Sequence, residues 1–313
     1  THIAIGFDMP GPTFRNEIYA DYKAHREKPP EDLIASFPYI EKIAAAFNIP
    51  VVKLSGFEAD DIIGTLAKEA EKHNFITYMM TPDKDYMQLV SENIIIHKPP
   101  FMGNPAQKIG VKEVLEKWGI KRIDQVIDFL GLQGDAADNI PGVPGVGAKT
   151  AQKLLEEFDT VENLLENTDK LKGKLKEKVE ANKEQALISK ELAVIKLDVP
   201  VKFDEEEFLR VPPNKEELTS LFEELEFNNL LKRVFVNEPS VQETKPTPKK
   251  SSTAQISMFG STADEEENEF VEKIELLETP HHFEVVNNYI LNTQTNSDVL
   301  FKGIKTSSGN QTG

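Results

Sequence analysis

Acidic side chains cluster at three short places in the sequence, each beside a glycine or at the end of an apolar run. The clusters lie in SGFEADDIIG, TPDKD and GDAADN, and a further aspartate follows the apolar run IAIGF. Carboxylates packed this closely repel one another, and burying them costs on the order of several kcal/mol without a counter-charge. Two divalent cations with oxygen ligands would supply that counter-charge and could promote hydrolysis of a phosphodiester. The predicted metal ligands are Asp8, Glu58, Asp60, Asp61, Asp83, Asp85, Asp135 and Asp138.

Each acidic cluster also has a purely structural interpretation. The EADD acids open a predicted helix, where they would complement the helix dipole. TPDKD could form a turn because Pro-Asp favours one, although in an extended segment Asp83 and Asp85 would point to the same side. GDAADN could be an Asx-rich loop that caps a helix. Metal binding is favoured because all these acids fall at predicted strand or helix edges.

A second motif, NIPGVPGVGAKTAQKLL, spans residues 139–155. Its glycines permit sharp backbone turns before a helix that begins near residue 148, and the free N–H groups there could bind phosphate. P-loop spacing is absent, so the motif fits a helix–hairpin–helix contact with the DNA backbone better. The alternative is an ordinary glycine-rich turn between helices. The predicted DNA-binding residues here are Gly142, Gly145, Gly147, Lys149 and Thr150.

Basic and aromatic side chains alternate in PGPTFRNEIYADYKAHREKPP. Arg15, Tyr22, Lys23 and Arg26 could hold single-stranded phosphates and stack on bases. For Tyr22, packing under a solvated basic face is an equally good interpretation.

The elements that must position these residues follow a strand–helix–strand–helix–strand pattern up to about residue 90. Strands are expected in IAIGF, IPVVKL and FITYMMT, and helices over residues 32–47 and 58–73. Such alternation predicts a parallel sheet covered on both faces, with the site at the carboxyl ends of the strands. The acids fall at those ends. Residues 120–230 are expected to be mostly helical.

Composition narrows the possible classes. The chain has 313 residues, no cysteine and a net charge of −17. Disulfides, zinc–thiolate sites and thiol catalysis are therefore excluded, and a reducing cytoplasm is expected. No apolar run approaches the roughly 20 residues of a membrane span. The acidic total argues only weakly against nucleic acid, because much of the acid is local.

Residues 237–269 change character, with TKPTPKK, GST and EEENE, and predict a disordered linker. The linker contains QISMF, in which Gln255, Met258 and Phe259 could form a docking peptide.

FDMPGPTFR, GFEADDIIGTLA, TPDKDYMQLV and GDAADNIPGVPGVGAKTA together resemble the 5′-nuclease (flap endonuclease) family, and within it the 5′→3′ exonuclease domains of bacterial DNA polymerase I. The resemblance covers residues 1–235. It implies an α/β fold with a PIN-like core over residues 1–118, a helical arch, and a helix–hairpin–helix subdomain over residues 119–236. Residues 270–313 would begin a 3′→5′ exonuclease-like domain.

The resemblance also implies roles. Two or more Mg²⁺ or Mn²⁺ ions would be held by the predicted ligands, and K⁺ by the hairpin. Arg15 and Lys23 would face the scissile phosphate. The expected partner is DNA with a 5′ flap, nick, primer–template junction or RNA primer end. QISMF resembles a peptide that binds the bacterial sliding clamp, and a monomer associated with the nucleoid is expected.

The family pattern has a first strand with a further metal-ligand aspartate, which the sequence given lacks, so a fragment is expected. This leaves three alternatives to a polymerase-linked nuclease. They are a non-catalytic DNA-binding fragment, a stand-alone exonuclease of the same family, and a PIN-type ribonuclease. A PIN-type ribonuclease would lack the GVPGVGAKTA hairpin, so this alternative fits the sequence least well.

Overall fold

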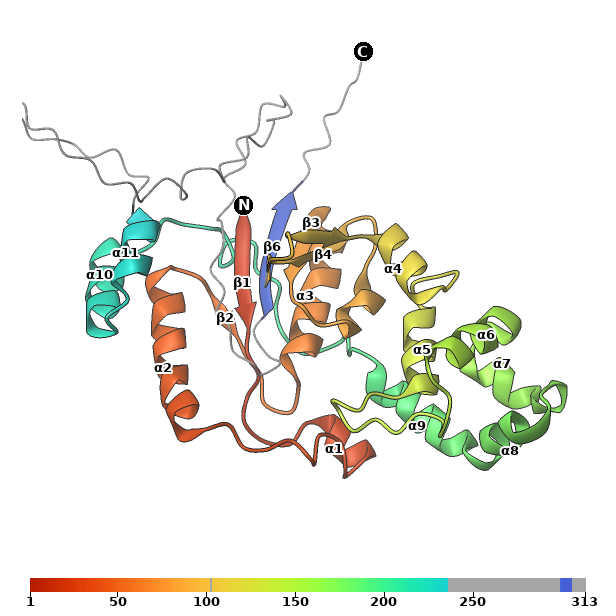
Figure 1. Cartoon of the computed structure of the whole chain (residues 1–313). Helices are drawn as coiled ribbons and strands as arrows, with labels where there is room; N and C mark the ends of the chain where they lie inside the picture. The colour runs from red at the N-terminus through yellow and green to blue at the C-terminus, as the bar shows by residue number, and fades with distance from the viewer. Residues whose placement is uncertain (102, 236–298, 306–313) are drawn as a thin grey trace, which may run out of the picture. The chain divides into compact units, whose positions relative to one another are not determined.

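The computed structural model describes residues 1–101, 103–235 and 299–305 (Figure 1). The chain divides into two compact units, one formed by Thr1–Asn228 with Asn288–Gly313 and the other by Asn229–Asn287. All of the predicted ligands and DNA-binding residues up to Thr150 lie in the first unit. Of the second unit, the described part is most of helix α11 (Asn228–Phe235). The predicted linker and its docking peptide lie outside the described residues.

A six-stranded sheet in the order β2-β1-β6-β3-β4-β5 forms the centre of the first unit. β1 pairs in parallel with β2 and β3 with β4, whereas β5 and β6 run antiparallel to their neighbours. The predicted parallel pairing is confirmed for the strands before residue 100, and β5 and β6 extend the sheet in the antiparallel direction. β5 returns beside β4 through a short connection, and a short connection permits only antiparallel pairing. The strands are β1 (His2–Gly6), β2 (Val51–Val52), β3 (Phe75–Met80), β4 (Ile94–Lys98), β5 (Gln107–Ile109) and β6 (Val299–Lys305).

Helix α3 (Ala59–Lys72) packs on β1 and β3 and sets the position of the EADD acids. Its apolar residues recur at helical spacing, and the buried set includes Ile62, Ile63 and Leu66, each with no exposed surface. The helix approaches the sheet closely, since a Cβ atom on Gly6 would lie 2.6 Å from the Ile63 side chain. This close packing places the first turn of α3 next to the end of β1.

The helical region packs mainly on the buried helix α5, which contacts α6, α7 and α9. α5 and α9 approach closely at Gly131, where a Cβ atom would meet the Lys190 backbone at 2.9 Å. The Lys190 ammonium also donates to the Asp128 carboxylate at 2.6 Å across this contact. The helices of the region are α4 (Val111–Trp118), α5 (Gln125–Gln133), α6 (Ala148–Phe158), α7 (Val161–Glu166), α8 (Gly173–Ala181), α9 (Lys183–Ala193) and α10 (Lys215–Glu224), with a 3₁₀ turn at Thr168–Lys170.

Most predicted elements before residue 90 are confirmed. The two expected helices correspond to α2 (Glu31–Ala46) and α3, and the three strands to β1, β2 and β3. Of the two conformations considered for TPDKD, the extended one is wrong, because a 3₁₀ helix, η1 (Asp85–Leu89), begins at Asp85. The Thr81 hydroxyl accepts from the Asp83 N–H, and the Asp83 carboxylate accepts from the Asp85 N–H, both at 3.0 Å. These local bonds turn the chain after β3.

A short helix, α1 (Phe14–Ile18), lies between β1 and α2. No helix in the described ranges is both long and apolar enough to cross a membrane.

Candidate active site

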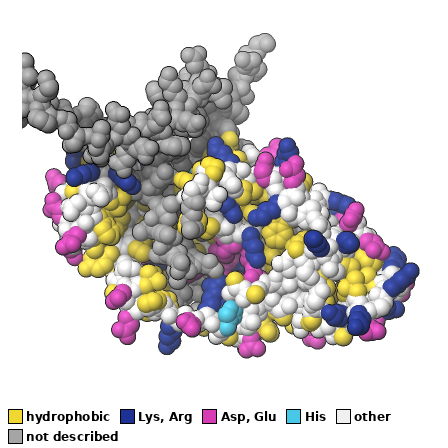
Figure 2. All heavy atoms as spheres, viewed as in Figure 1, with side chains coloured by type: hydrophobic (Ala, Val, Ile, Leu, Met, Phe, Trp, Pro, Cys, Tyr) yellow, Lys and Arg dark blue, Asp and Glu magenta, His cyan; other side chains and the backbone are white. Residues whose placement is uncertain are grey.

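The carboxylates gather at the carboxyl ends of the parallel strands, as expected from the alternating pattern. Asp8 follows β1, Glu58 is the N-cap of α3 after β2, and Asp83 follows β3. Asp135 and Asp138 come from the loop between α5 and α6. On one face, acidic side chains lie next to lysine and arginine side chains in a recess of the surface (Figure 2).

Two carboxylates of this cluster are held in strongly unfavourable surroundings for charge. Burial, followed by the charges of Asp83 and Glu58, raises the pKa of Asp60 well above its ordinary value. Burial, followed by the charge of Asp83, raises the pKa of Asp85 to about 8. Such shifts indicate carboxylates that lack sufficient counter-charge within the protein.

The hydrogen bonds of the cluster satisfy some of its carboxylate oxygens but not all of them. The Tyr86 hydroxyl donates to Asp60 at 2.9 Å, and the Ala59 N–H donates to Asp8 at 2.6 Å. Oδ1 of Asp85, in contrast, is buried without any hydrogen-bond partner. An orphaned buried carboxylate oxygen is costly. A hard divalent cation with oxygen ligands fits this donor set chemically.

The metal prediction does not extend to a preformed coordination shell. Among the residues that the structure describes, no three His, Asp or Glu side chains are close enough together to hold one ion. Basic side chains of the chain itself pair with several of these acids and occupy oxygens that a metal ion would otherwise bind.

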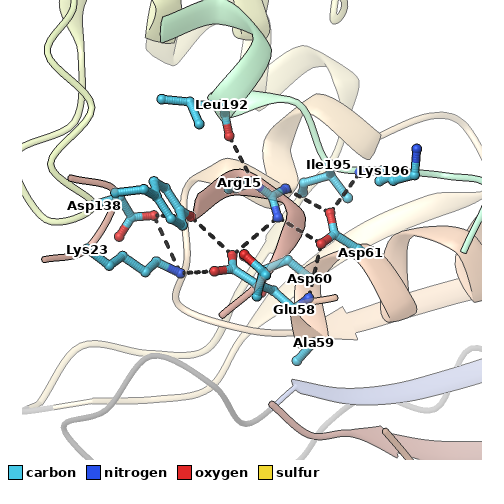
Figure 3. A network of polar contacts seen from close by, with 12 residues as sticks. Arg15, Lys23, Glu58, Ala59, Asp60, Asp61, Asp138, Leu192, Ile195 and Lys196 are labelled. Carbon is cyan, nitrogen blue, oxygen red and sulfur yellow. Dashed lines mark hydrogen bonds and ion pairs between the residues drawn. The ribbon is translucent and has the colours of Figure 1, made fainter. Parts of the chain in front are cut away.

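Arg15 and Asp61 form a buried pair (Figure 3). The two guanidinium NH groups donate to the two Asp61 oxygens at 2.8 and 2.7 Å, and the same guanidinium donates to the carbonyls of Leu192 and Val194. The backbone N–H groups of Lys196 and Glu58 also donate to Asp61. Arg15 is 3% exposed and Asp61 is fully buried.

These contacts correct two residue assignments. Arg15 was expected to face a scissile phosphate, but its donors point into the protein and bind Asp61 and the carboxyl-terminal end of α9, at Leu192 and its C-cap Val194. Asp61 was expected to ligate metal, but its oxygens cap α3 and hold Arg15. The structural alternative for the EADD acids, placement at the start of a helix, therefore applies to Asp61, which also completes a capping box with Glu58.

Lys23, Tyr22 and Arg26 contact two acids of the cluster, Glu58 and Asp138, and Figure 3 shows Lys23 beside both acids. Lys23 Nζ lies 2.7 Å from Glu58 Oε1 and 3.8 Å from Asp138 Oδ2, and Arg26 pairs with Asp138. The Tyr22 hydroxyl lies 3.1 Å from Glu58 and 3.3 Å from Asp138. Tyr22 is 4% exposed, so the expected stacking of its ring on a base is not what the structure shows. Packing, the alternative interpretation, fits better.

Sequence reasoning missed Lys84. Its ammonium lies 2.8 Å from Asp135 Oδ2, and its position between Asp83 and Asp85 was the signal that could have revealed it. A lysine placed within a pair of acids is a natural counter-charge.

The glycine motif forms a tight hairpin between α5 and α6. Asp135 and Ile140 exchange backbone hydrogen bonds at 2.9 and 2.8 Å. At Gly142, with φ of +59°, a Cβ atom would lie 2.4 Å from the Gly134 nitrogen. Two side chains of α9 hold the Gly142 backbone: Ser189 Oγ accepts from the Gly142 N–H, and the Gln185 amide donates to the Gly142 carbonyl. The hairpin is therefore braced internally, and it ends at Gly147, the N-cap of α6, which has no side-chain capping bond.

Two family profiles match the chain in succession. The profile of the 5′-3′ exonuclease N-terminal resolvase-like domain covers residues 1–119, and that of the 5′-3′ exonuclease C-terminal SAM fold covers residues 122–216. The chain belongs to the 5′-3′ exonuclease family.

Curated relatives agree. DNA polymerase I of Bacillus subtilis (strain 168) is 43% identical over 235 residues, which are 75% of this chain and 27% of that protein. DNA polymerase I of Bacillus caldotenax is 39% identical over 254 residues, which are 81% of this chain and 29% of that protein. The chain thus spans less than a third of the length of these relatives, and the 5′-3′ exonuclease domain of DNA polymerase I is the part that it resembles.

Solved structures share the fold. The T5 D15 protein, co-crystallized with metal ions, matches with a TM-score of 0.52 and 20% identity over 70% of this chain and 82% of that chain. The catalytic core of Rad2 in complex with DNA substrate matches with a TM-score of 0.51 and 16% identity over 74% of this chain and 78% of that chain. The mixed α/β core followed by a helical region is therefore a known architecture.

Proposed function

We propose that this chain is a metal-dependent 5′→3′ nuclease that hydrolyses phosphodiester bonds at DNA 5′ ends or flaps, in the manner of the exonuclease region of a DNA polymerase I. The observation that carries the proposal is the under-neutralised cluster at the strand ends. It combines the raised pKa values of Asp60 and Asp85 with a buried Asp85 oxygen that has no partner. Family membership fits the same chemistry.

Asp8, Asp60, Asp83, Asp85 and Asp135 are the residues that would hold divalent cations. Mg²⁺ or Mn²⁺ bound there would lower the pKa of a water molecule and stabilise charge on the leaving oxygen. Tyr86 orients the Asp60 carboxylate by its hydrogen bond. Glu58 and Asp138 are engaged by Lys23 in the structure, and both remain proposed ligands whose charge Lys23 balances.

Lys23 is the side chain that we assign to the phosphate. Its side chain is 21% exposed, whereas that of Arg15 is 3% exposed, so of these two only Lys23 has surface available to a substrate. Its φ of +55° is an uncommon conformation for a lysine. The backbone N–H of Lys23 donates to the Asp138 carbonyl at 2.9 Å, which fixes this conformation. Arg15 is a positioning residue, since it ties α3 to the carboxyl-terminal end of α9.

The hairpin is proposed to grip duplex DNA by its phosphates, as a helix–hairpin–helix element does. Gly147 supports this role. It has an extended backbone, and a Cβ atom there would meet nothing within 4 Å. The fold therefore does not require glycine at this position, whereas the close approach of a phosphate to the α6 N-terminus would. Lys149 and Thr150 in the first turn, with Gly145, are proposed to complete the grip, and K⁺ remains a proposed ligand of the hairpin.

The test is cleavage of a 5′-labelled flap duplex in Mg²⁺ or Mn²⁺, with binding measured separately in Ca²⁺. Short labelled products that depend on metal are expected from the parent chain and not from Asp60→Asn. Glu116→Gln is a matched control, because Glu116 is an exposed acid on α4 with only a 3.9 Å contact to Lys112. Cleavage by Asp60→Asn at the parent rate would refute the assignment.

A non-catalytic DNA-binding role is the second candidate. It is favoured by one observation, namely that no three acids of the described part lie close enough to hold an ion. Tight binding in Ca²⁺ with no cleavage in any metal would establish it.

The peptide of residues 255–259 supports a separate proposal, binding to a bacterial sliding clamp. A labelled peptide of residues 250–262 should bind the clamp, and Phe259→Ala should abolish that binding. No binding at high-micromolar clamp would contradict it.

A further inference from the structure

A hollow of about 410 Å³ lies between the β4–β5 hairpin and helix α4, apart from the proposed metal ligands. α4 packs against β5, and Figure 1 shows α4 beside this edge of the sheet. The residues that line the hollow are Lys98, Gln107, Lys108, Ile109, Glu113 and Lys117. Two lysines, Lys98 and Lys117, share this hollow with one acid, Glu113, in a protein of net charge −17.

Lys98 and Lys117 carry the positive charge of the hollow. In the part of the chain that the structure describes, neither ammonium has a carboxylate partner within ion-pair distance. Burial, followed by the charges of Lys98 and Lys84, lowers the pKa of Lys117. The acid of the lining, Glu113, accepts from the Gly110 N–H at 2.9 Å and caps α4, and its single charge leaves the two lysines in excess. Like charges held together in this way favour binding of an anion.

Lys108 does not share this arrangement. In the β4–β5 ladder Lys98 is paired with Gln107, and Lys108 with His97. Paired residues lie on the same face and successive residues on opposite faces, so Lys98 and Lys108 point to opposite sides of the hairpin. The Lys108 ammonium accordingly lies 5.2 Å from the centre of the Tyr78 ring. Lys98 and Lys117 are therefore the side chains available to a ligand in the hollow.

One cationic side chain, Lys84, relates the hollow to the acidic cluster. Lys84 contacts Asp135 of the cluster and is close enough to Lys117 to lower its pKa. An anion that continues from the cluster to the hollow would meet cationic side chains along its path. A nucleic-acid strand is such an anion, since it carries a phosphate on every nucleotide.

The β4–β5 hairpin also has an exposed aromatic side chain. Phe101, in the turn between β4 and β5, is 52% exposed, and its backbone exchanges hydrogen bonds with Asn104 at 3.1 and 2.9 Å. An exposed aromatic ring on the same strand pair as a lysine is a combination that surfaces binding single strands use to hold the backbone and stack on a base. This combination favours nucleic acid over a small anion as the occupant.

We propose that Lys98 and Lys117 bind a backbone phosphate of the nucleic-acid substrate, as an anchoring point separate from the hairpin at residues 139–150. The inference rests on the proposed nuclease function and extends it. It assigns the β4–β5 edge of the sheet to the substrate path.

The salt dependence of binding tests the proposal. Affinity of the full chain for a flap duplex is measured in Ca²⁺ at several salt concentrations, since each phosphate contact contributes a slope of about −0.9 to log K against log salt. The double variant Lys98→Gln/Lys117→Gln should have a slope smaller in magnitude by about 1 and a several-fold lower affinity at low salt. Lys108→Gln, which removes the same charge from the opposite face of the same hairpin, should keep the parent slope.

Cross-linking supplies a measurement that leaves Lys98 and Lys117 unchanged. The chain has no cysteine, so Gln107→Cys places a single thiol at the hollow, where a photoreactive group can be attached. This derivative should cross-link to DNA several-fold more than the same label on Lys108→Cys.

Equal slopes for the double variant and Lys108→Gln, together with equal cross-linking, would overturn this inference while leaving the nuclease intact. A parent chain that neither binds nor cleaves DNA would instead overturn the proposed function, and this inference with it.

Discussion

Replacing Arg15 distinguishes a buried structural ion pair from a catalytic contact with phosphate. Arg15→Gln would leave Asp61, which is fully buried, without its bidentate partner. Breaking a buried pair in this way costs about 3–5 kcal/mol, because a charge remains uncompensated. The carbonyls of Leu192 and Val194 would lose donors as well, so the cost should lie toward the upper end of that range.

The assay is urea unfolding of the metal-free chain, followed by circular dichroism, beside the flap cleavage rate per folded molecule. Domains are stable by about 5–15 kcal/mol, so the expected loss is a large fraction of the total. Arg26→Gln is the matched control. Arg26 pairs with Asp138 but its side chain is 34% exposed, and a pair of that kind contributes about 0–1 kcal/mol.

A double variant separates lost charge balance from lost packing. Arg15→Gln/Asp61→Asn should regain part of the stability that Arg15→Gln loses, because no buried charge is left unpaired. The reasoning from burial would be refuted if the free energy of unfolding of Arg15→Gln lay within about 1 kcal/mol of that of the parent while its cleavage rate was lost. Arg15 would then act on the phosphate.

Three further predictions concern the acidic cluster and the hairpin. Asp60→Asn should raise the melting temperature in EDTA and remove the upward shift that Mg²⁺ gives the parent, since burial and neighbouring acids raise the pKa of Asp60; a lower melting temperature in EDTA would contradict this. Asp85, with its pKa raised from 3.8 to about 8, keeps a proton in the folded chain that the unfolded chain loses. The metal-free free energy of unfolding should therefore fall as pH rises from about 4 to about 8, by at most about 1.4 kcal/mol per pH unit, and level off above; urea titrations that show the same slope for Asp85→Asn would assign it to another group. Gly147→Ala should weaken duplex binding several-fold at unchanged melting temperature. Gly142→Ala, forced into φ of +59° against the Gly134 backbone, should instead lower the free energy of unfolding by more than about 1 kcal/mol. Equal effects of the two substitutions on stability would contradict the geometry.

Local pattern was sufficient for much of the fold. Apolar residues at helical spacing placed α2 within one residue at each end, because a helix that packs on a sheet needs one continuous apolar face. Alternation of strands and helices placed the acids at one edge of the sheet, because parallel strands share the direction of their carboxyl ends. The mixed sheet was less accessible, since the pairing of β5 and β6 depends on contacts between distant segments.

The sequence by itself determined which residues are acidic, basic or glycine, and where along the chain they meet strand and helix ends. Tertiary structure decided which of them are free to act. Arg15 and Lys23 are both basic residues of one motif, but contact with the carboxyl-terminal end of α9 buries the first, whereas the second remains partly exposed beside Glu58. Asp60 and Asp61 are adjacent, yet one turns toward other acids and the other toward a guanidinium. Spacing along the chain cannot make these distinctions, because burial and charge balance depend on segments more than a hundred residues apart.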